Sequence, residues 1–158
     1  RYQSGDAPRL VTLPPLTGTL GGGWTLADQD ILGELYTRLH LEQQLDQSVA
    51  AAAAEGWGGD RYAVYHDQEH DQLVLVWKSV WDTQVDAREF VDDYTLYLKR
   101  AAHGAAGGEA ESTGPGRSCW QVAESYRCLS WNGAAALVVR GPDPATVERI
   151  LGEIILSP

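Results

Sequence analysis

The dipeptide Asn132-Gly133 constrains the fold of this chain more than any other feature. It lies between two apolar runs, 125–131 and 134–140. Both residues of a tight two-residue hairpin turn need a positive φ, which Asn and Gly adopt readily. The two runs are therefore expected to pair as antiparallel strands. With another strand expected over 118–122, the last third of the chain predicts an antiparallel meander.

A second pair of strands is expected in the middle of the chain, over 61–65 and 73–81. Both runs are rich in Val, Tyr and Trp and are bounded by polar residues. The second run has apolar residues on both of its faces, which is typical of a central strand covered on both sides. The segment Gly58-Gly59-Asp60 is expected to form the turn that precedes the pair.

Helical spacing of apolar residues predicts three helices. The first is expected from an N-cap at Thr25 to a stop at Gly56, and the second follows an N-cap pair formed by Thr83 and Asp86. The third follows Asp143, with Pro at the first helical position. The order α-β-β-α-β-β-β-α favours an α+β domain, with an antiparallel sheet of about five strands and helices packed mainly on one face.

The chain is expected to form one domain with a lead-in. Residues 1–23 contain several Pro and a run of three Gly, which predicts an extended segment. Residues 24–158 are long enough to bury a core of their own. Within them, 102–117 is rich in Gly and Ala and has no large apolar side chain, so a mobile loop is expected there.

The charge balance restricts the classes of partner. The chain has 12 basic and 22 acidic residues, a net charge of −10. Nucleic acids and anionic lipids need clustered basic surfaces, so neither is expected as a partner. No apolar run approaches the ~20 residues of a membrane span. The chain begins with Arg1 and contains no Met, so a mature or excised fragment is expected.

The two cysteines, Cys119 and Cys128, are candidates for a disulfide. An even number of cysteines in an exported protein is typical of a bridge, and the strands that carry them are expected to be neighbours. Free buried thiols and a metal site are the alternatives, although metal and redox pairs usually have the closer C-x-x-C spacing.

The segment His66-Asp67-Gln68-Glu69-His70 fits H-x-x-E-H, the inverted zinc-peptidase motif. That motif works because a helix places both His on one face. Here the segment lies between two expected strands, and 67–72 is entirely polar, like the tip of a hairpin. A solvated turn is therefore expected, with no catalytic zinc. His66, Glu69 and His70 remain candidates only for weak metal binding at the surface.

No other catalytic arrangement is evident, and no cofactor is expected. The sequence has no G-x-S-x-G elbow and no phosphate-binding Gly loop. His40 falls among polar neighbours on the first expected helix, with no evident partner. Five tryptophans on or beside expected strands either pack in the core or form an exposed aromatic patch for a ligand. They are Trp57, Trp77, Trp81, Trp120 and Trp131.

Four stretches of the chain resemble the C-terminal part of a group of uncharacterised exported bacterial and archaeal proteins. They are GDAPRLVTLPPL, GWGGDRYAVY, LVLVWKSVWDTQVDAREF and VVRGPDPATVERIL. The resemblance implies an HExxH zincin-like peptidase region upstream, to which 1–16 would connect. This chain contains no HExxH, so the implied metal ligands have no counterparts here, and HDQEH is not their equivalent.

Two functions follow as expectations. The first is a non-catalytic accessory or interaction domain of an exported, lipoprotein-like metallopeptidase relative, secreted or anchored at the cell surface. Its partner would be the upstream region, which would help to cover the apolar residues of the lead-in, or else another copy of the chain. The alternative is an independent module that binds a small ligand in a Trp-lined cleft or a metal at the His66/His70 turn.

Overall fold

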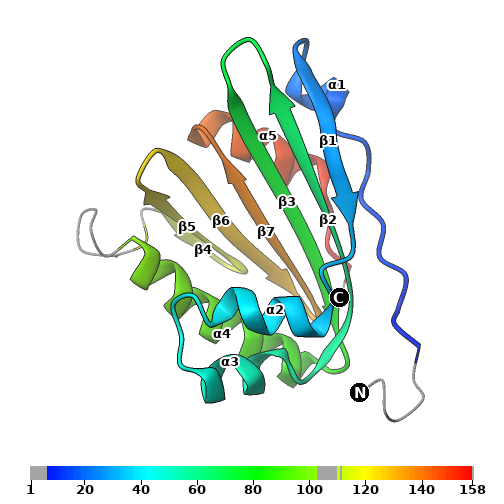
Figure 1. Cartoon of the computed structure of the whole chain (residues 1–158), viewed down its shortest axis with the longest axis vertical. Coiled ribbons are helices and arrows are strands. Elements are labelled where there is room, and N and C mark those ends of the chain that lie inside the picture. Colours follow the sequence, from blue (N-terminus) through cyan, green and yellow to red (C-terminus); the bar gives the residue numbers. More distant parts are fainter. Residues whose placement is uncertain (1–6, 103–109, 111, 158) are drawn as a thin grey trace.

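The computed structural model describes residues 7–102, 110 and 112–157. In this part of the chain, seven strands form one antiparallel sheet with the order β1-β2-β3-β7-β6-β5-β4 (Figure 1). The strands are β1 (Trp24–Asp30), β2 (Trp57–Asp67), β3 (Gln72–Trp81), β4 (Ser112–Gly114), β5 (Arg117–Val122), β6 (Ser125–Asn132) and β7 (Ala135–Gly141). The helices are α1 (Thr17–Leu20), α2 (Gly33–Leu41), α3 (Gln47–Ala54), α4 (Gln84–Ala101) and α5 (Pro144–Glu153). The predicted α+β class and antiparallel sheet are confirmed, with more strands than the five expected.

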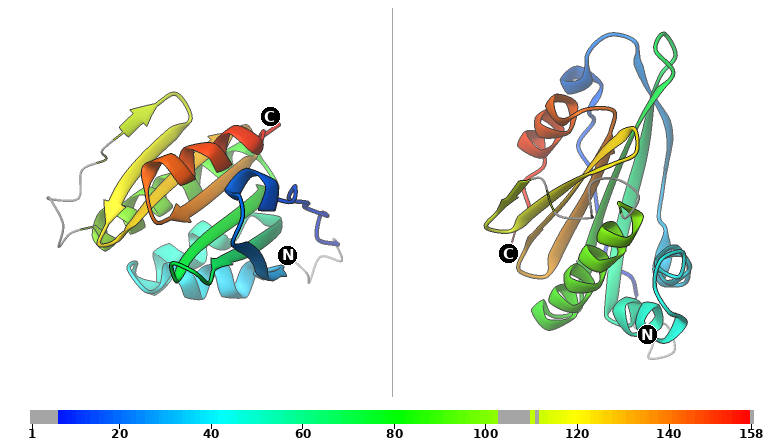
Figure 2. Two further views of the ribbon diagram at one scale, coloured as in Figure 1. Left: turned by 90° about the horizontal axis from the view of Figure 1, so that it is seen from above. Right: turned by 90° about the vertical axis from the view of Figure 1, so that its left-hand side faces the viewer.

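Both faces of the sheet are covered by helices. The helices α2, α3 and α4 pack on one face, and α1 and α5 pack on the other, as the right-hand view of Figure 2 shows. The larger helical layer thus lies on one face, as expected, and the opposite face carries a smaller one. The central strand β3 contributes Trp77 and Trp81 to the first core and Val74 and Val76 to the second.

The two predicted hairpins form, and local signals account for them. Strands β2 and β3 pair up to Asp67 and Gln72, with the polar turn beyond. Strands β6 and β7 pair up to Asn132 and Ala135, so the turn is Gly133-Ala134, one residue later than expected. Gly133 supplies the positive φ, 58°, while Asn132 remains in the strand.

The single long helix expected from Thr25 to Gly56 is a wrong prediction. Residues 24–30 form the edge strand β1, and two shorter helices follow it. Six of its seven residues are exposed, so the strand is held by backbone pairing with β2 and not by burial. Gly33, at φ +85°, begins α2, and Asp46 adopts an extended conformation between α2 and α3. The two other predicted caps form: Thr83 accepts from the Asp86 N–H, and Asp143 from the Thr146 N–H.

Gly58-Gly59-Asp60 also differs from its prediction, because it lies inside β2 and forms no turn. The register shifts between Trp57 and Gly59, as in a β-bulge. The lead-in runs beside this point, and the Arg9 N–H donates to the Gly58 carbonyl at 2.7 Å. A Cβ on Gly59 would lie 2.3 Å from the carbonyl oxygen of Arg9, so the close approach requires glycine.

The lead-in is integrated into the domain over its described residues. The short helix α1 interrupts the extended path, and Val11, Leu16 and Leu20 are buried. The backbone N–H of Leu16 also donates to the hydroxyl of Tyr65 on β2, at 3.1 Å. The domain itself therefore covers most of the apolar lead-in, and Leu10 stays exposed.

Part of the mobile loop expected at 102–117 belongs to the sheet. Ser112–Gly114 forms β4 and pairs with β5, and Ala102 is buried. Residues 103–109 and 111 lie outside the described residues. None of the described helices combines the length and apolar character needed to cross a membrane.

Candidate functional site

The HDQEH segment closes the β2–β3 hairpin, as predicted, and its two histidines have different partners. His66 Nε2 lies 3.0 Å from Asp71 Oδ1. His70 Nδ1 donates to Asp67 Oδ2 at 2.8 Å. This hydrogen bond raises the pKa of His70 and lowers the pKa of Asp67. The backbone N–H of Glu69 donates to the same carboxylate at 3.0 Å.

These contacts divide the motif into two separate pairs. Nε2 of His66 is paired with Asp71, and Nδ1 of His70 is paired with Asp67, so each histidine has its own carboxylate partner. In the described part of the chain, no three His, Cys, Asp or Glu side chains are grouped so as to hold a metal ion.

The tryptophans belong mainly to the core. Trp57, Trp77, Trp81 and Trp120 are each at most 3% exposed, and Trp131 is half-buried beneath the guanidinium of Arg88. They therefore do not form an exposed aromatic patch. Trp77 contributes to the wall of a cavity described below.

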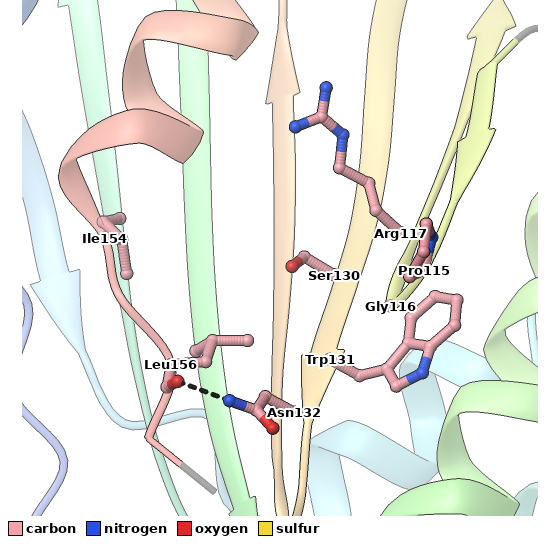
Figure 3. Close-up of a pocket in the computed structure, with 8 residues that line it drawn as sticks. All are labelled: Pro115, Gly116, Arg117, Ser130, Trp131, Asn132, Ile154 and Leu156. Carbon is pink, nitrogen blue, oxygen red and sulfur yellow. Dashed lines mark hydrogen bonds between the residues drawn. The ribbon is translucent and has the colours of Figure 1, made fainter.

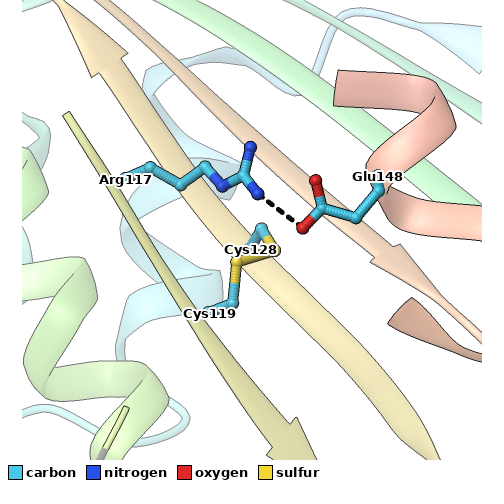
Figure 4. The surroundings of a disulfide bond; sticks show 4 residues. All are labelled: Arg117, Cys119, Cys128 and Glu148. Carbon is cyan, nitrogen blue, oxygen red and sulfur yellow. Dashed lines mark hydrogen bonds and ion pairs between the residues drawn. A yellow bond between two sulfur atoms is a disulfide. The ribbon is translucent and has the colours of Figure 1, made fainter. Parts of the chain in front are cut away.

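Cys119 and Cys128 form a disulfide, the first of the alternatives considered from the sequence. They lie directly opposite each other on β5 and β6, and both are fully buried on the side of α5 (Figure 4). An ion pair between Arg117 on β5 and Glu148 on α5 lies beside the bridge. The bridge links β5 to β6, and the ion pair links β5 to α5.

A polar hollow of about 510 Å³ lies beside Trp131 (Figure 3). Asn132 Nδ2 closes one side by donating to the Leu156 carbonyl at 2.8 Å. Its one charged side chain, Arg117, already pairs with Glu148. The hollow therefore brings no titratable cluster together.

Figure 1 shows the upper ends of β2, β3, β7 and β6 with no helix in front of them. A larger cavity is lined by residues of these four strands. We call it the sheet-face cleft; its volume is about 870 Å³. Its floor is a row of side chains that the strand register places side by side across β2, β3, β7 and β6. The row consists of Val64, Leu75, Arg140 and Arg127. The tips of the β2–β3 and β5–β6 hairpins form its rim, with Leu73, His70, Asp71 and Glu124 among the rim residues.

A smaller cavity of about 190 Å³ adjoins the cleft at Leu75. We call it the His40 chamber; its walls are Leu32, His40, Tyr62, Leu75, Trp77 and Tyr94. The sequence offered no partner for His40, but Nε2 of its ring lies 3.0 Å from the hydroxyl of Tyr94. The ring also packs against Tyr97, with 4.8 Å between centroids.

Burial sets the protonation states in the His40 chamber. Burial and then the charge of Arg127 lower the pKa of His40 to about 4, so its ring is neutral near pH 7. Burial raises the pKa values of Tyr94 and Tyr97, so both phenols keep their protons. Burial and then Arg140 lower the pKa of Arg127, which still carries its charge. The chamber is therefore a neutral, aromatic space next to two guanidinium groups.

Sequence reasoning missed Arg127, Arg140 and the position of His40. The available signal was a single charged residue on one face of each of two apolar strands. To locate the site from this signal, one would need the register between β6 and β7, which pairs the arginines, and the contact of His40 on α2 with Trp77 on β3.

No curated protein matches this chain. A family model does match it, over residues 24–151, from the first residue of β1 into α5. The chain therefore belongs to the family described as Domain of unknown function (DUF8575).

Proposed function

We propose that this domain is a non-catalytic binding module that holds a small ligand in the sheet-face cleft. The observation that carries the proposal is the cleft itself, about 870 Å³ on the part of a sheet face that α2 and α4 leave uncovered. Ligand pockets commonly have volumes of about 300–1,000 Å³, with apolar walls and a few polar groups that converge. Here Val64, Leu73 and Leu75 supply apolar surface, and two arginines supply the polar groups.

Two titratable groups of the adjoining His40 chamber favour binding over catalysis. A general base works best with a pKa near the working pH. His40, with a pKa of about 4, is a poor proton acceptor at pH 7, and the fully buried Tyr94 is a poor donor of its proton. This argument supports a role without turnover for the domain on its own.

An extracytoplasmic location is part of the proposal. The buried Cys119–Cys128 bridge is compatible with an oxidising compartment, where such bridges form and persist. Intact mass measured without reductant on protein recovered from its native compartment tests this point. We expect the mass of the bridged form, and two freely alkylated thiols would contradict it.

The binding role can be tested with 8-anilinonaphthalene-1-sulfonate as a probe, followed by its fluorescence and by amide shifts in the protein. We expect shifts at cleft residues, and weaker binding in Leu73→Glu, because Leu73 lies on the rim and is 58% exposed. Val85→Glu is the matched control, since Val85 is 76% exposed on α4, away from the cleft. Shifts confined to the hollow beside Trp131, or equal effects of both variants, would contradict the proposal.

A second candidate role is docking to another folded region, as the family resemblance implies for a zincin-like region upstream. The observation that favours it is a stripe of exposed apolar side chains on α2 and just before it. Ile31, Leu35 and Leu39 in this stripe are exposed by 49%, 55% and 41%. Such a stripe on a helix is typical of an interaction surface. Leu10 of the lead-in is a further apolar residue that the described part of this domain leaves exposed.

The docking role is tested by binding measurements between this domain and a separately expressed upstream region. Leu35→Lys should weaken the association and Val85→Lys should not. Sedimentation of the domain alone distinguishes self-association through the same stripe. Equal binding by both variants would contradict docking through α2.

A further inference from the structure

Arg127 and Arg140 form a pair of like charges on the floor of the sheet-face cleft. The register sets them directly opposite each other on β6 and β7. Side chains in this relationship have Cβ atoms about 5 Å apart, and like charges there destabilise a sheet. The chain has 22 acidic residues and 12 basic ones, so carboxylates were abundant as partners.

Neither arginine forms an ion pair with a carboxylate in the described part of the chain. Arg127 is half-buried, and its Nε donates to the hydroxyl of Ser125 at 3.1 Å. The next residues along the same row are apolar, Leu75 on one side and Trp120 on the other. Each guanidinium carries five N–H donors, so the pair has donors to spare.

The titratable groups around the pair form no ion pair with it in the described residues. Tyr94 and Tyr97 keep their protons, and His40 is neutral near pH 7. On the rim, Asp71 lies next to His66, His70 donates to Asp67, and Glu124 sits in the β5–β6 turn. The floor of the cleft therefore combines concentrated positive charge with apolar and aromatic walls.

We infer that the cleft binds a small amphipathic oxyanion, with its carboxylate or phosphate group held between Arg127 and Arg140 and its apolar part against Leu75 and the His40 chamber. The guanidinium forks of two facing arginines suit bidentate contacts to such an oxyanion. Binding would relieve the repulsion within the pair, which explains why two like charges are kept together without a protein carboxylate. This inference rests on the proposed binding role and adds the class of ligand.

The test compares four probes by amide-shift titration: phenylacetate, phenyl phosphate, the neutral 2-phenylethanol and inorganic phosphate. We expect an aromatic anion to bind roughly tenfold or more tightly than the alcohol, because hydrogen bonds to a charged group are stronger than hydrogen bonds to a neutral hydroxyl. The stronger of phenylacetate and phenyl phosphate identifies the head group. Inorganic phosphate should bind more weakly than phenyl phosphate, because it lacks the apolar part.

Variants locate the anion. Arg127→Gln and Arg140→Gln should each remove the preference for the aromatic anions over the alcohol, and Arg149→Gln, an exposed arginine on α5, should not. Without probe, Arg140→Gln should be at least as stable as the wild type in urea, because it removes a like-charge contact. A purely structural arginine would give the opposite result. The ring signals of His40 should titrate at higher pH with an anion bound, because the anion offsets the charge of Arg127.

The outcomes separate this inference from the proposed function. If the alcohol binds in the cleft as well as the anions do, and no arginine variant changes that, the oxyanion inference is overturned and the binding role stands. If none of these probes, nor the anilinonaphthalene dye, shifts cleft residues, both are overturned. A loss of stability in Arg140→Gln without probe also counts against the inference.

Discussion

Nε1 of Trp77 donates to Oδ2 of Asp60 at 3.1 Å, which joins the central strand β3 to β2 through side chains as well as through the backbone. The same carboxylate accepts from Nε1 of Trp57 at 3.1 Å and from the backbone N–H groups of Leu32 and Gly33 at 2.8 Å. Asp60 is only 1% exposed, and these four donors compensate its burial. It also caps the N-terminus of α2, which has no cap of its own.

Asp60→Asn should lower the free energy of unfolding by about 2–4 kcal/mol. An amide replaces one carboxylate oxygen with an NH₂ group, which cannot accept from the two N–H donors that face it. Urea denaturation followed by tryptophan fluorescence measures the change. Asp92→Asn is the control, because Asp92 is exposed and pairs with the exposed Arg88, so its substitution should change stability little. Equal effects of the two substitutions would show that Asp60 does not hold this junction together.

The parts of the fold set by neighbouring residues could be predicted from the sequence. The caps at Thr83 and Asp143 depend on residues three positions away, and both form. The strand limits 118–122 and 125–131 already place Cys119 opposite Cys128. The edge strand β1 could not be predicted in this way, because its partners in β2 lie between 32 (Asp30 and Tyr62) and 43 (Trp24 and Asp67) positions further along the chain.

The pairing of the two arginines in the candidate site depends on the position of the β6–β7 turn, which differs from the prediction by one residue. A turn at Asn132-Gly133 would set Arg127 opposite Val138, whereas the observed turn at Gly133-Ala134 sets it opposite Arg140. Turn chemistry favoured Asn-Gly, but the Asn132 side chain bonds to the Leu156 carbonyl. That partner lies after α5 and is invisible to local reasoning. The arginine pair and the Asp60 contacts both come from such tertiary relationships.

Reduction of the Cys119–Cys128 bridge should lower the free energy of unfolding by about 2–3 kcal/mol, mainly because the unfolded chain regains entropy. The sheet should stay folded, because β5 and β6 remain paired through six residue pairs. Urea denaturation with and without reductant measures the difference. The double variant Cys119→Ala/Cys128→Ala is the control and should not respond to reductant. A wild-type midpoint that reductant leaves unchanged would contradict the prediction.

Stability should fall between pH 6.5 and 4 because of His40. Its pKa in the folded state, about 4, lies below its ordinary value of 6.5, so protons bind preferentially to the unfolded chain in this window. The contribution of neutral His40 to the free energy of unfolding is fully present above pH 6.5. It is lost as the pH falls toward 4, to a total of about 3 kcal/mol. Urea denaturation at several pH values should show a shallower pH dependence in His40→Gln.

His70 provides a control, because its pKa is shifted in the opposite direction from that of His40. Its pKa is raised by Asp67, so its contribution is present at low pH and is lost as the pH rises through its folded value. His70→Gln should therefore not flatten the loss on acidification. If His40→Gln and the wild type lose stability in parallel, His40 is not the group responsible.

Zinc should produce no hydrolytic activity through the HDQEH turn. His66 lies beside Asp71, and His70 donates to Asp67, and in the described part of the chain no three His, Cys, Asp or Glu side chains are grouped so as to hold a metal ion. The raised pKa of His70 adds a proton that a metal must displace. Peptidase and esterase assays with and without zinc, together with calorimetric titration of zinc, should show no turnover and only weak binding. Each assay includes His66→Ala, His70→Ala and, as a control outside the turn, His40→Gln. Zinc-dependent turnover that disappears in His66→Ala or His70→Ala but persists in His40→Gln would establish the turn as a metal site and overturn the non-catalytic role.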